Sequence, residues 1–200
     1  MGTRGVYGFR LNGEDLVQYN HWDSYPSGLG ITILDFIRST TTDEMRKIAQ
    51  GLILVDEDSK PTPEQIDECR QYLDLGVSKQ SPYDWYCLLR EAQGKPAAWK
   101  DGLQYVIDSH EFMADSLFCE WAYCINLDDE TLEVYKGYNT NPNAPGRYTR
   151  KGHYKAHDGT IFYGVALIRT IPLSEIQVMS DEEIQALVDE LEHSRIEAKV

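Results

Sequence analysis

A hairpin signal near the start of the chain constrains its fold more than any other feature, because it places two strands ahead of every helix. Residues 3–11 form a β-leaning run, and Asn12-Gly13 follows at once. That dipeptide favours the two-residue turn of a β-hairpin, in which both positions take positive φ. A returning strand is expected over residues 16–20, so any sheet in this protein has to be built onto an antiparallel pair.

Three more strand patterns lie in the second half of the chain. Residues 118–127 and 131–135 flank Asp128-Asp129-Glu130, which predicts a second hairpin. Residues 160–170 contain the most apolar run, from Ile161 to Ile168. A continuous apolar run of that length is typical of a central strand that is covered on both faces.

Helical periodicity dominates between these strands and returns near the C-terminus. Helices are expected over residues 30–38, 42–52, 62–76, 81–94, 99–107 and 180–191. Two of them start at capping-box sequences, at Thr62 and at Ser180. The pattern predicts one globular α+β domain over residues 1–200, with a mixed, mainly antiparallel sheet that joins the N- and C-terminal strands. Helices from the middle of the chain and from its C-terminus should pack this sheet.

The composition indicates a folded, acidic protein. Of its 200 residues, 42% are hydrophobic and 13 are tyrosine, which is enough to bury a sizeable core. The 33 acidic and 19 basic residues give a formal net charge of -14. Binding to a nucleic-acid duplex is not expected, because such binding relies on Lys and Arg to displace counterions. The partners that stay open are a small polar or anionic molecule and another protein.

The cysteines and the chain's hydropathy point to a cytoplasmic protein. Cysteines stand at positions 69, 87, 119 and 124, with no C-x-x-C pair and no pattern of a structural zinc site. We expect them to be reduced and buried. No basic start is followed by an apolar run, and no stretch approaches the roughly 18 apolar residues of a membrane span. Neither a secretory signal nor a membrane partner is expected.

The loop after the second predicted strand is the first candidate site. It combines the polar residues Asn20, His21 and Asp23 with the rings of Trp22 and Tyr25. Aromatic walls with a few hydrogen-bonding groups are typical of a site for a small polar ligand. His21 and Asp23 would share a face of a strand and so can act as general base and orienting carboxylate. The alternative interpretation is that the rings anchor the core and the polar groups satisfy turns.

The second candidate site is a basic stretch in the otherwise acidic chain. Residues 147–155 hold four of the 19 basic residues, interleaved with tyrosines. We predict that its side chains bind an anion by charge and stacking; they are Arg147, Tyr148, Arg150, Lys151 and His153. His153 and His157 would have metal-ligand spacing only on a helix, and Gly152 argues against one, so no metal is predicted. The alternative is a solvated loop, and the binding hypothesis requires this stretch to meet residues 19–28 around one cavity.

The N-terminal hairpin, together with Gly2-Thr3, resembles the opening of the N-terminal-nucleophile (Ntn) hydrolases. The resemblance covers about the first 30 residues and implies an αββα sandwich in which Thr3, once its amine is freed, attacks an amide carbonyl. Asn20, His21 and Asp23 occupy the place of that family's polar cluster, and Arg4 belongs to the predicted ligand-binding set. The sequence departs from the family's pattern at residue 2, because removal of Met1 alone leaves Gly2 in front of Thr3.

Three functions therefore stay open. The first is a binding or sequestering module for a small polar or anionic ligand. The second is an amide-bond hydrolase of Ntn type with Thr3 as nucleophile, and the third is an acidic protein-interaction domain. No cofactor is predicted, because the chain contains no phosphate-binding loop, no G-x-S-x-G and no H-E-x-x-H sequence.

Overall fold

One five-stranded mixed sheet forms the centre of the protein. The computed structural model describes residues 2–196, and its sheet has the strand order β2-β1-β5-β6-β9. The strands are β1 (Gly5–Leu11), β2 (Glu14–Asn20), β5 (Trp121–Asn126), β6 (Thr131–Lys136) and β9 (Ala166–Pro172). Within this sheet β1 and β5 run parallel, and the other three pairings are antiparallel. This confirms the expected α+β fold, in which a mainly antiparallel sheet joins the N- and C-terminal strands.

The two predicted hairpins are confirmed and are tied together at their turns. Asn12 and Gly13 both take positive φ, at 53° and 79°. The carboxylate of Asp128, from the β5–β6 turn, accepts hydrogen bonds from both of their backbone amides, at 2.7 and 2.8 Å. Because β1 lies beside β5, one side chain satisfies the backbone of the neighbouring turn and holds the two hairpins in register.

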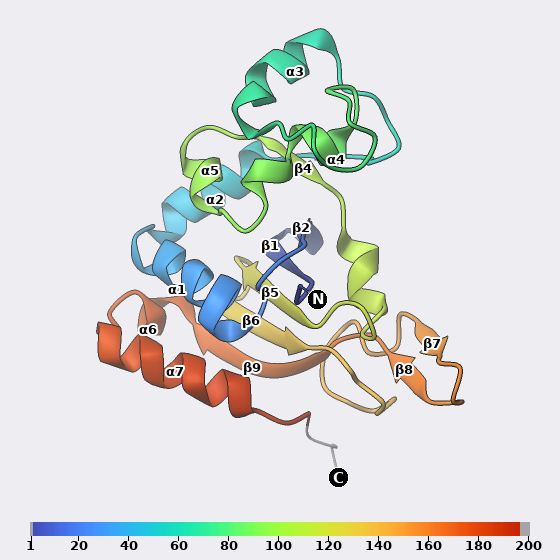
Figure 1. Cartoon of the computed structure of the whole chain (residues 1–200). Helices are drawn as coiled ribbons and strands as arrows, with labels where there is room; N and C mark the ends of the chain where they lie inside the picture. The colour runs from blue at the N-terminus through green and yellow to red at the C-terminus, as the bar shows by residue number, and fades with distance from the viewer. Residues whose placement is uncertain (1, 197–200) are drawn as a thin grey trace.

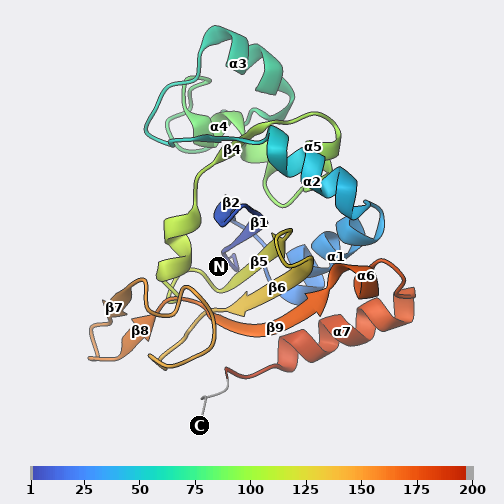
Figure 2. The same cartoon turned by 180° about the vertical axis from the view of Figure 1, so that it is seen from behind.

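In the part of the chain that the structure describes, seven α-helices pack around the sheet. They are α1 (Ile31–Arg38), α2 (Thr42–Gly51), α3 (Pro63–Cys69), α4 (Trp85–Leu88), α5 (Ala97–Lys100), α6 (Leu173–Ile176) and α7 (Asp181–His193). Helices α1, α6 and α7 gather at one end of the molecule, and α3 and α4 lie at the opposite end (Figures 1 and 2). Capping boxes begin α2 at Thr41, α3 at Thr62 and α7 at Ser180, so the last two predicted starts are confirmed.

The two faces of the sheet are buried by different parts of the chain. The larger core lies on the helical face, where the strands contribute Tyr7, Phe9, Leu11, Trp121, Tyr123, Ile125, Leu132, Val134 and Ile171. The opposite face carries a smaller core that combines Val6, Val17, Ala122, Cys124 and Tyr135 with Met113 from a 3-10 helix and with Tyr148 and Val165 from loops. All four cysteines are buried and reduced. Within residues 2–196 no helix is long and apolar enough to cross a membrane.

The prediction of a central strand over residues 161–168 is wrong. The chain bends at Gly164, where a Cβ would lie 2.1 Å from the carbonyl oxygen of Tyr148. The run is therefore split between β8 (Ile161–Tyr163), which pairs with β7 (His153–Lys155), and β9 at the edge of the main sheet. Apolar character alone cannot distinguish one long strand from two short ones divided by a glycine.

Two of the predicted helices are also corrected. Residues 81–94 form only α4 and a 3-10 turn over Arg90–Ala92, and residues 105–107 form β4 (Tyr105–Ile107), which runs parallel to β3 (Ile53–Val55).

The αββα arrangement implied by the Ntn resemblance would need two stacked sheets. Residues 2–196 instead form one five-stranded sheet and two two-stranded ones.

Candidate functional site

The loop that follows β2 is held in a fixed shape by its own polar groups. The buried Asn20 side chain donates hydrogen bonds to the carbonyl of Trp22 and to the hydroxyl of Ser24, the latter at 2.8 Å. The Ser24 amide in turn donates to the carbonyl of Thr3 at 3.0 Å. Asp23 takes a positive φ of 51°. These contacts turn the indole of Trp22 outward, where it is 53% exposed.

A second segment is anchored opposite this loop by the hydroxyl of Tyr7 in β1. This hydroxyl donates to the carbonyl of Ala92 at 3.1 Å and accepts from the amide of Lys95 at 3.2 Å. Gly94 lies between them with a φ of +72°, and a Cβ there would come within 3.0 Å of the Asn20 amide oxygen. Only glycine combines this backbone conformation with so close an approach. Residues 90–95 are therefore fixed beside the loop after β2.

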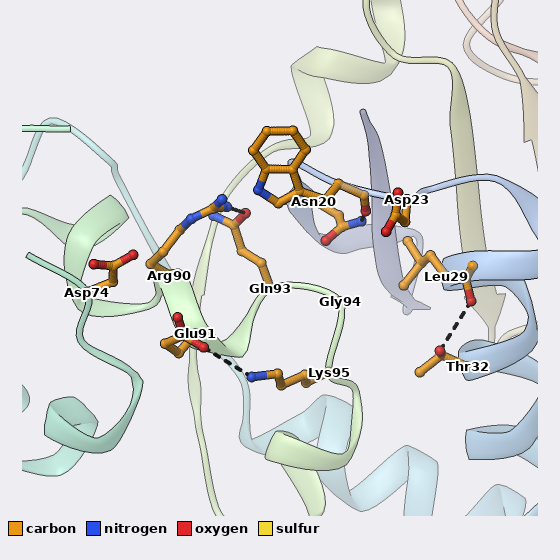
Figure 3. A pocket seen from close by; sticks show the side chains of 12 residues that line it. Asn20, Asp23, Leu29, Thr32, Asp74, Arg90, Glu91, Gln93, Gly94 and Lys95 are labelled. Carbon is orange, nitrogen blue, oxygen red and sulfur yellow. Dashed lines mark hydrogen bonds and ion pairs between the residues drawn. The ribbon is translucent and has the colours of Figure 1, made fainter. Parts of the chain in front are cut away.

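Between these two segments lies a cavity of about 490 Å³. Figure 3 shows Arg90, Glu91, Gln93 and Lys95 on one side of it, and Asp23, Leu29 and Thr32 on the other, with Asn20 between them. Within the first wall Lys95 pairs with Glu91 at 3.3 Å, and the Arg90 guanidinium donates to the Gln93 side chain. Trp22, Gly28 and Asp74 complete the lining. The cavity is polar, with one aromatic side chain.

A neighbouring cavity of about 570 Å³ opens at the N-terminus. Its lining includes Thr3, Arg4, His21 and Trp22, which the sequence predicts as site residues, together with Glu120 and Tyr138. Trp22 lines both cavities, so it separates the N-terminal cavity from the one beside Arg90. Asn20 and Asp23 line the other cavity, and within residues 2–196 no hydrogen bond or ion pair joins His21 to Asp23, so the predicted pair of general base and orienting carboxylate is not formed.

Two arginines flank His21 at this junction, and both lie against aromatic rings. The guanidinium of Arg4 lies 4.7 Å from the centre of the Phe118 ring, and that of Arg90 lies 5.7 Å from the Tyr86 ring. Among residues 2–196, neither arginine forms an ion pair with a carboxylate. Stacking holds a guanidinium in place while leaving its edge N–H groups available.

The surroundings of His21 favour its neutral form. Burial lowers its pKa below the ordinary 6.5, and the positive charges of Arg90 and Arg4 lower it further. Its Nδ1 lies 2.8 Å from the Tyr19 hydroxyl, and its ring stands edge-to-face against Trp22 at 4.4 Å. The arrangement offers two cationic groups, a neutral imidazole and an exposed indole.

The basic stretch does not join this site through Arg147 and Tyr148, so the expectation of one shared cavity is wrong for these two residues. Tyr148 is fully buried in the core on the opposite face of the sheet. Arg147 forms ion pairs with Asp15, at 3.0 Å, and with Glu133, and the Tyr148 hydroxyl donates to Asp15. Because Asp15 and Glu133 form ion pairs with it, the Arg147 guanidinium is not available to a ligand.

The remaining basic side chains of the stretch are exposed. Arg150 is held only by the side chain of Asn143 at 3.3 Å, and the Lys151 ammonium lies 5.0 Å from the ring of Tyr148. His153 lies on the exposed strand β7, beside Tyr154, whose ring is 6.2 Å from that of Phe118. None of Arg150, Lys151 and His153 lines the cavities around residues 19–28, so the expectation of one shared cavity is wrong for these residues too.

The remaining predicted residues are placed as follows. Tyr25 is exposed and lines neither cavity, and the negative charge of Asp23 raises its pKa. Thr3 lines the N-terminal cavity, and the backbone of Gly2 before it packs against Trp22, because a Cβ at Gly2 would lie 2.1 Å from the indole. Residues 2–196 contain no cluster of three or more His, Cys, Asp or Glu side chains suited to a metal ion.

Sequence reasoning missed Arg90, Gln93 and Lys95, the wall opposite the loop. Arg90 and Gln93 lie in a segment that is predicted to be helical, Lys95 directly follows it, and no motif marks any of the three. The only local signal is Gly94, a helix-stop residue whose positive φ aims the backbone at Asn20.

Comparisons with protein-family models, with curated proteins and with solved structures found no match to this chain. The geometry of the site is therefore the basis for any functional statement.

Proposed function

We propose that this protein binds a small planar monoanion, such as an aromatic carboxylate, at the junction of Arg90 and Trp22. The observation that carries the proposal is the pair of stacked arginines, Arg4 and Arg90, which form no ion pair although the chain has a net charge of -14. In so acidic a protein a cation without a carboxylate partner is available to a ligand. A guanidinium edge matches a carboxylate by two parallel hydrogen bonds.

The neighbouring side chains support a ligand with a ring and one negative charge. Trp22 offers an exposed face for stacking, and its partner His21 adds no charge of its own. Asp23, Asp74 and Glu91 line the same cavity, and only Glu91 is paired with a lysine. These carboxylates would repel a multiply charged ligand such as a nucleoside triphosphate, whereas one anionic group can sit at Arg90.

Binding can be measured through Trp22. The other three tryptophans, Trp85, Trp99 and Trp121, are buried, so collisional quenching by acrylamide reports mainly on Trp22. Three probes separate the contributions of ring and charge: nicotinate has both, nicotinamide has the ring alone, and acetate has the charge alone. Nicotinate should protect Trp22 from quenching in a saturable way, and the other two should bind more weakly.

Substitution of the arginine tests the charge. Arg90→Gln is expected to weaken nicotinate binding about tenfold, the equivalent of one charge-assisted hydrogen bond, and to leave nicotinamide unaffected. Arg70→Gln is the matched control, because Arg70 is exposed, pairs with Asp67 and does not line the cavity. Equal protection by all three probes, or no saturation by nicotinate at low salt, would refute the proposal.

A second candidate function is amide-bond hydrolysis by Thr3, and one observation favours it. Thr3 lines the same cavity as Arg4 and His21, where an arginine could stabilise the oxyanion of a tetrahedral intermediate. This chemistry requires that both Met1 and Gly2 be removed, so that the Thr3 amine can serve as the base. The intact mass of the purified protein tests this directly, because a retained Gly2 excludes the mechanism.

A further inference from the structure

A third cavity lies on the other side of His21, and its chemistry differs from that of the anion site. It has a volume of about 590 Å³ and is lined by three half-buried rings, those of Tyr19, Tyr86 and Phe112. The Tyr19 ring lies 5.3 Å from Phe112 in an edge-to-face arrangement and 6.4 Å from Tyr86. The rings therefore form a continuous aromatic wall.

Carboxylates border this aromatic wall. Glu57, Asp108, Glu111 and Asp115 all line the cavity. Asp108 is occupied by His110 at 2.7 Å, and Asp115 accepts a hydrogen bond from the Leu117 amide at 3.2 Å. Glu57 and Glu111 form no ion pair within residues 2–196. Two carboxylates at the edge of an aromatic cavity thus lack an ion-pair partner among these residues, although burial and the nearby Asp84 raise the pKa of Glu57.

We propose that this cavity binds a small organic ammonium ion, with the cation against the rings of Tyr19 and Phe112 and within the field of Glu57 and Glu111. Aromatic faces attract ammonium groups through their quadrupole, and quaternary ammonium ligands are recognised in this way. The Tyr86 ring already accepts the guanidinium of Arg90, so Tyr19 and Phe112 are the rings left for a ligand. The inference does not depend on the anion site; the aromatic cavity shares His21 with the N-terminal cavity and no lining residue with the cavity beside Arg90.

Alternative occupants fit this cavity less well. A metal ion would need converging carboxylates, and the described residues hold no such cluster. An anion would be repelled by Glu57 and Glu111, and a neutral apolar molecule would leave both charges unused. An organic cation uses the rings and the carboxylates together, and the net charge of -14 favours its approach.

A matched pair of probes tests the proposal by isothermal titration calorimetry on the full chain. Choline carries the quaternary ammonium group, and 3,3-dimethylbutan-1-ol is its neutral isostere with the same shape. We expect choline to bind at least about tenfold more tightly than the isostere, and its affinity to fall with added salt. Equal affinities for the two probes, or no binding of choline, would overturn the proposal.

Two variants locate the binding. Glu111→Gln removes an exposed carboxylate and should leave the fold intact. It should weaken choline binding severalfold. Its control is Glu14→Gln, at the exposed start of β2. Phe112→Leu removes a ring but keeps an apolar side chain, and it should reduce the preference for choline over the isostere. If neither variant changes choline binding, the site is not this cavity. Nicotinate binding to the same samples reports on the anion site separately, so one proposal can fail while the other stands.

Discussion

Replacement of Arg147 by methionine tests whether this residue stabilises the fold rather than binding a ligand. Arg147→Met keeps most of the side-chain volume and removes the charge. Asp15 and Glu133 then lose the cation between them, and their side chains are only 7% and 11% exposed. Removal of one partner from a buried ion pair typically costs about 3–5 kcal/mol, because the other charge is left without compensation.

The remaining contacts of the two carboxylates set the size of the effect. Asp15 still receives hydrogen bonds from Arg10, at 2.8 Å, and from Tyr148, and Glu133 still receives them from Asn126 and Tyr135. The loss should therefore lie at the lower end of the range, at about 3 kcal/mol. For a chain of this size that corresponds to a fall in Tm of about 6–12 °C.

The effect should also depend on pH in a defined direction. Burial opposes ionisation of Asp15, but hydrogen bonds from Tyr148 and Arg10 and the charge of Arg147 outweigh it, so its pKa lies below the ordinary 3.8. A carboxyl with a lowered folded-state pKa stabilises the fold above its unfolded-state pKa, and this contribution is lost as the pH falls through the lowered value. The difference in stability between the wild type and Arg147→Met should thus shrink below about pH 4.

Urea denaturation at several pH values, followed by circular dichroism, gives the free energies of unfolding. Arg150→Met is the control, because Arg150 is exposed and should change stability by less than about 0.5 kcal/mol. Nicotinate should still bind to Arg147→Met under conditions in which the variant is folded. If Arg147→Met lowers Tm by less than about 2 °C, or if Arg150→Met lowers it equally, Arg147 does not belong to the structural network.

Three further predictions test the site and its support. The His21 imidazole should titrate below 6.5 by NMR, and Arg90→Gln should raise its pKa because a nearby positive charge is removed. Ser180→Ala should remove the cap of α7 and cost about 1 kcal/mol in thermal or urea denaturation. Gly28→Ala should destabilise the protein by about 1–3 kcal/mol and weaken nicotinate binding, because its Cβ would lie 2.2 Å from a carbonyl oxygen of the loop. Gly51→Ala, whose Cβ would meet nothing closer than 3.7 Å, should not destabilise the protein.

Features with strong local determinants could be predicted from the sequence. The Asn12-Gly13 turn requires positive φ at both positions, and the Ser180 capping box satisfies backbone groups within one turn of helix. Both predictions are confirmed because the interactions involved connect residues that are close in the chain. The same holds for α1, whose apolar positions follow the helical period.

The failures arose where distant residues decide the structure. The bend at Gly164 depends on the close approach of Tyr148, and the short strand β4 exists because β3 pairs with it from about fifty residues earlier. Neither partner can be identified from local periodicity. The wall of the anion site depends on the Tyr7 hydroxyl, which fixes residues 92–95 from across the fold.

The contrast between Arg147 and Arg90 shows why the density of basic residues in the sequence is a poor guide to the candidate site. Arg147 belongs to the most basic stretch of the chain, yet Asp15 and Glu133 already neutralise it. Arg90 stands among acidic neighbours, yet none of the described carboxylates pairs with it. A ligand competes with the protein's own counter-charges, so an arginine is available for binding when the fold leaves it unpaired. That condition depends on which residues the sheet brings together, and it can be tested by comparing the effects of Arg90→Gln and Arg147→Met on binding and on stability.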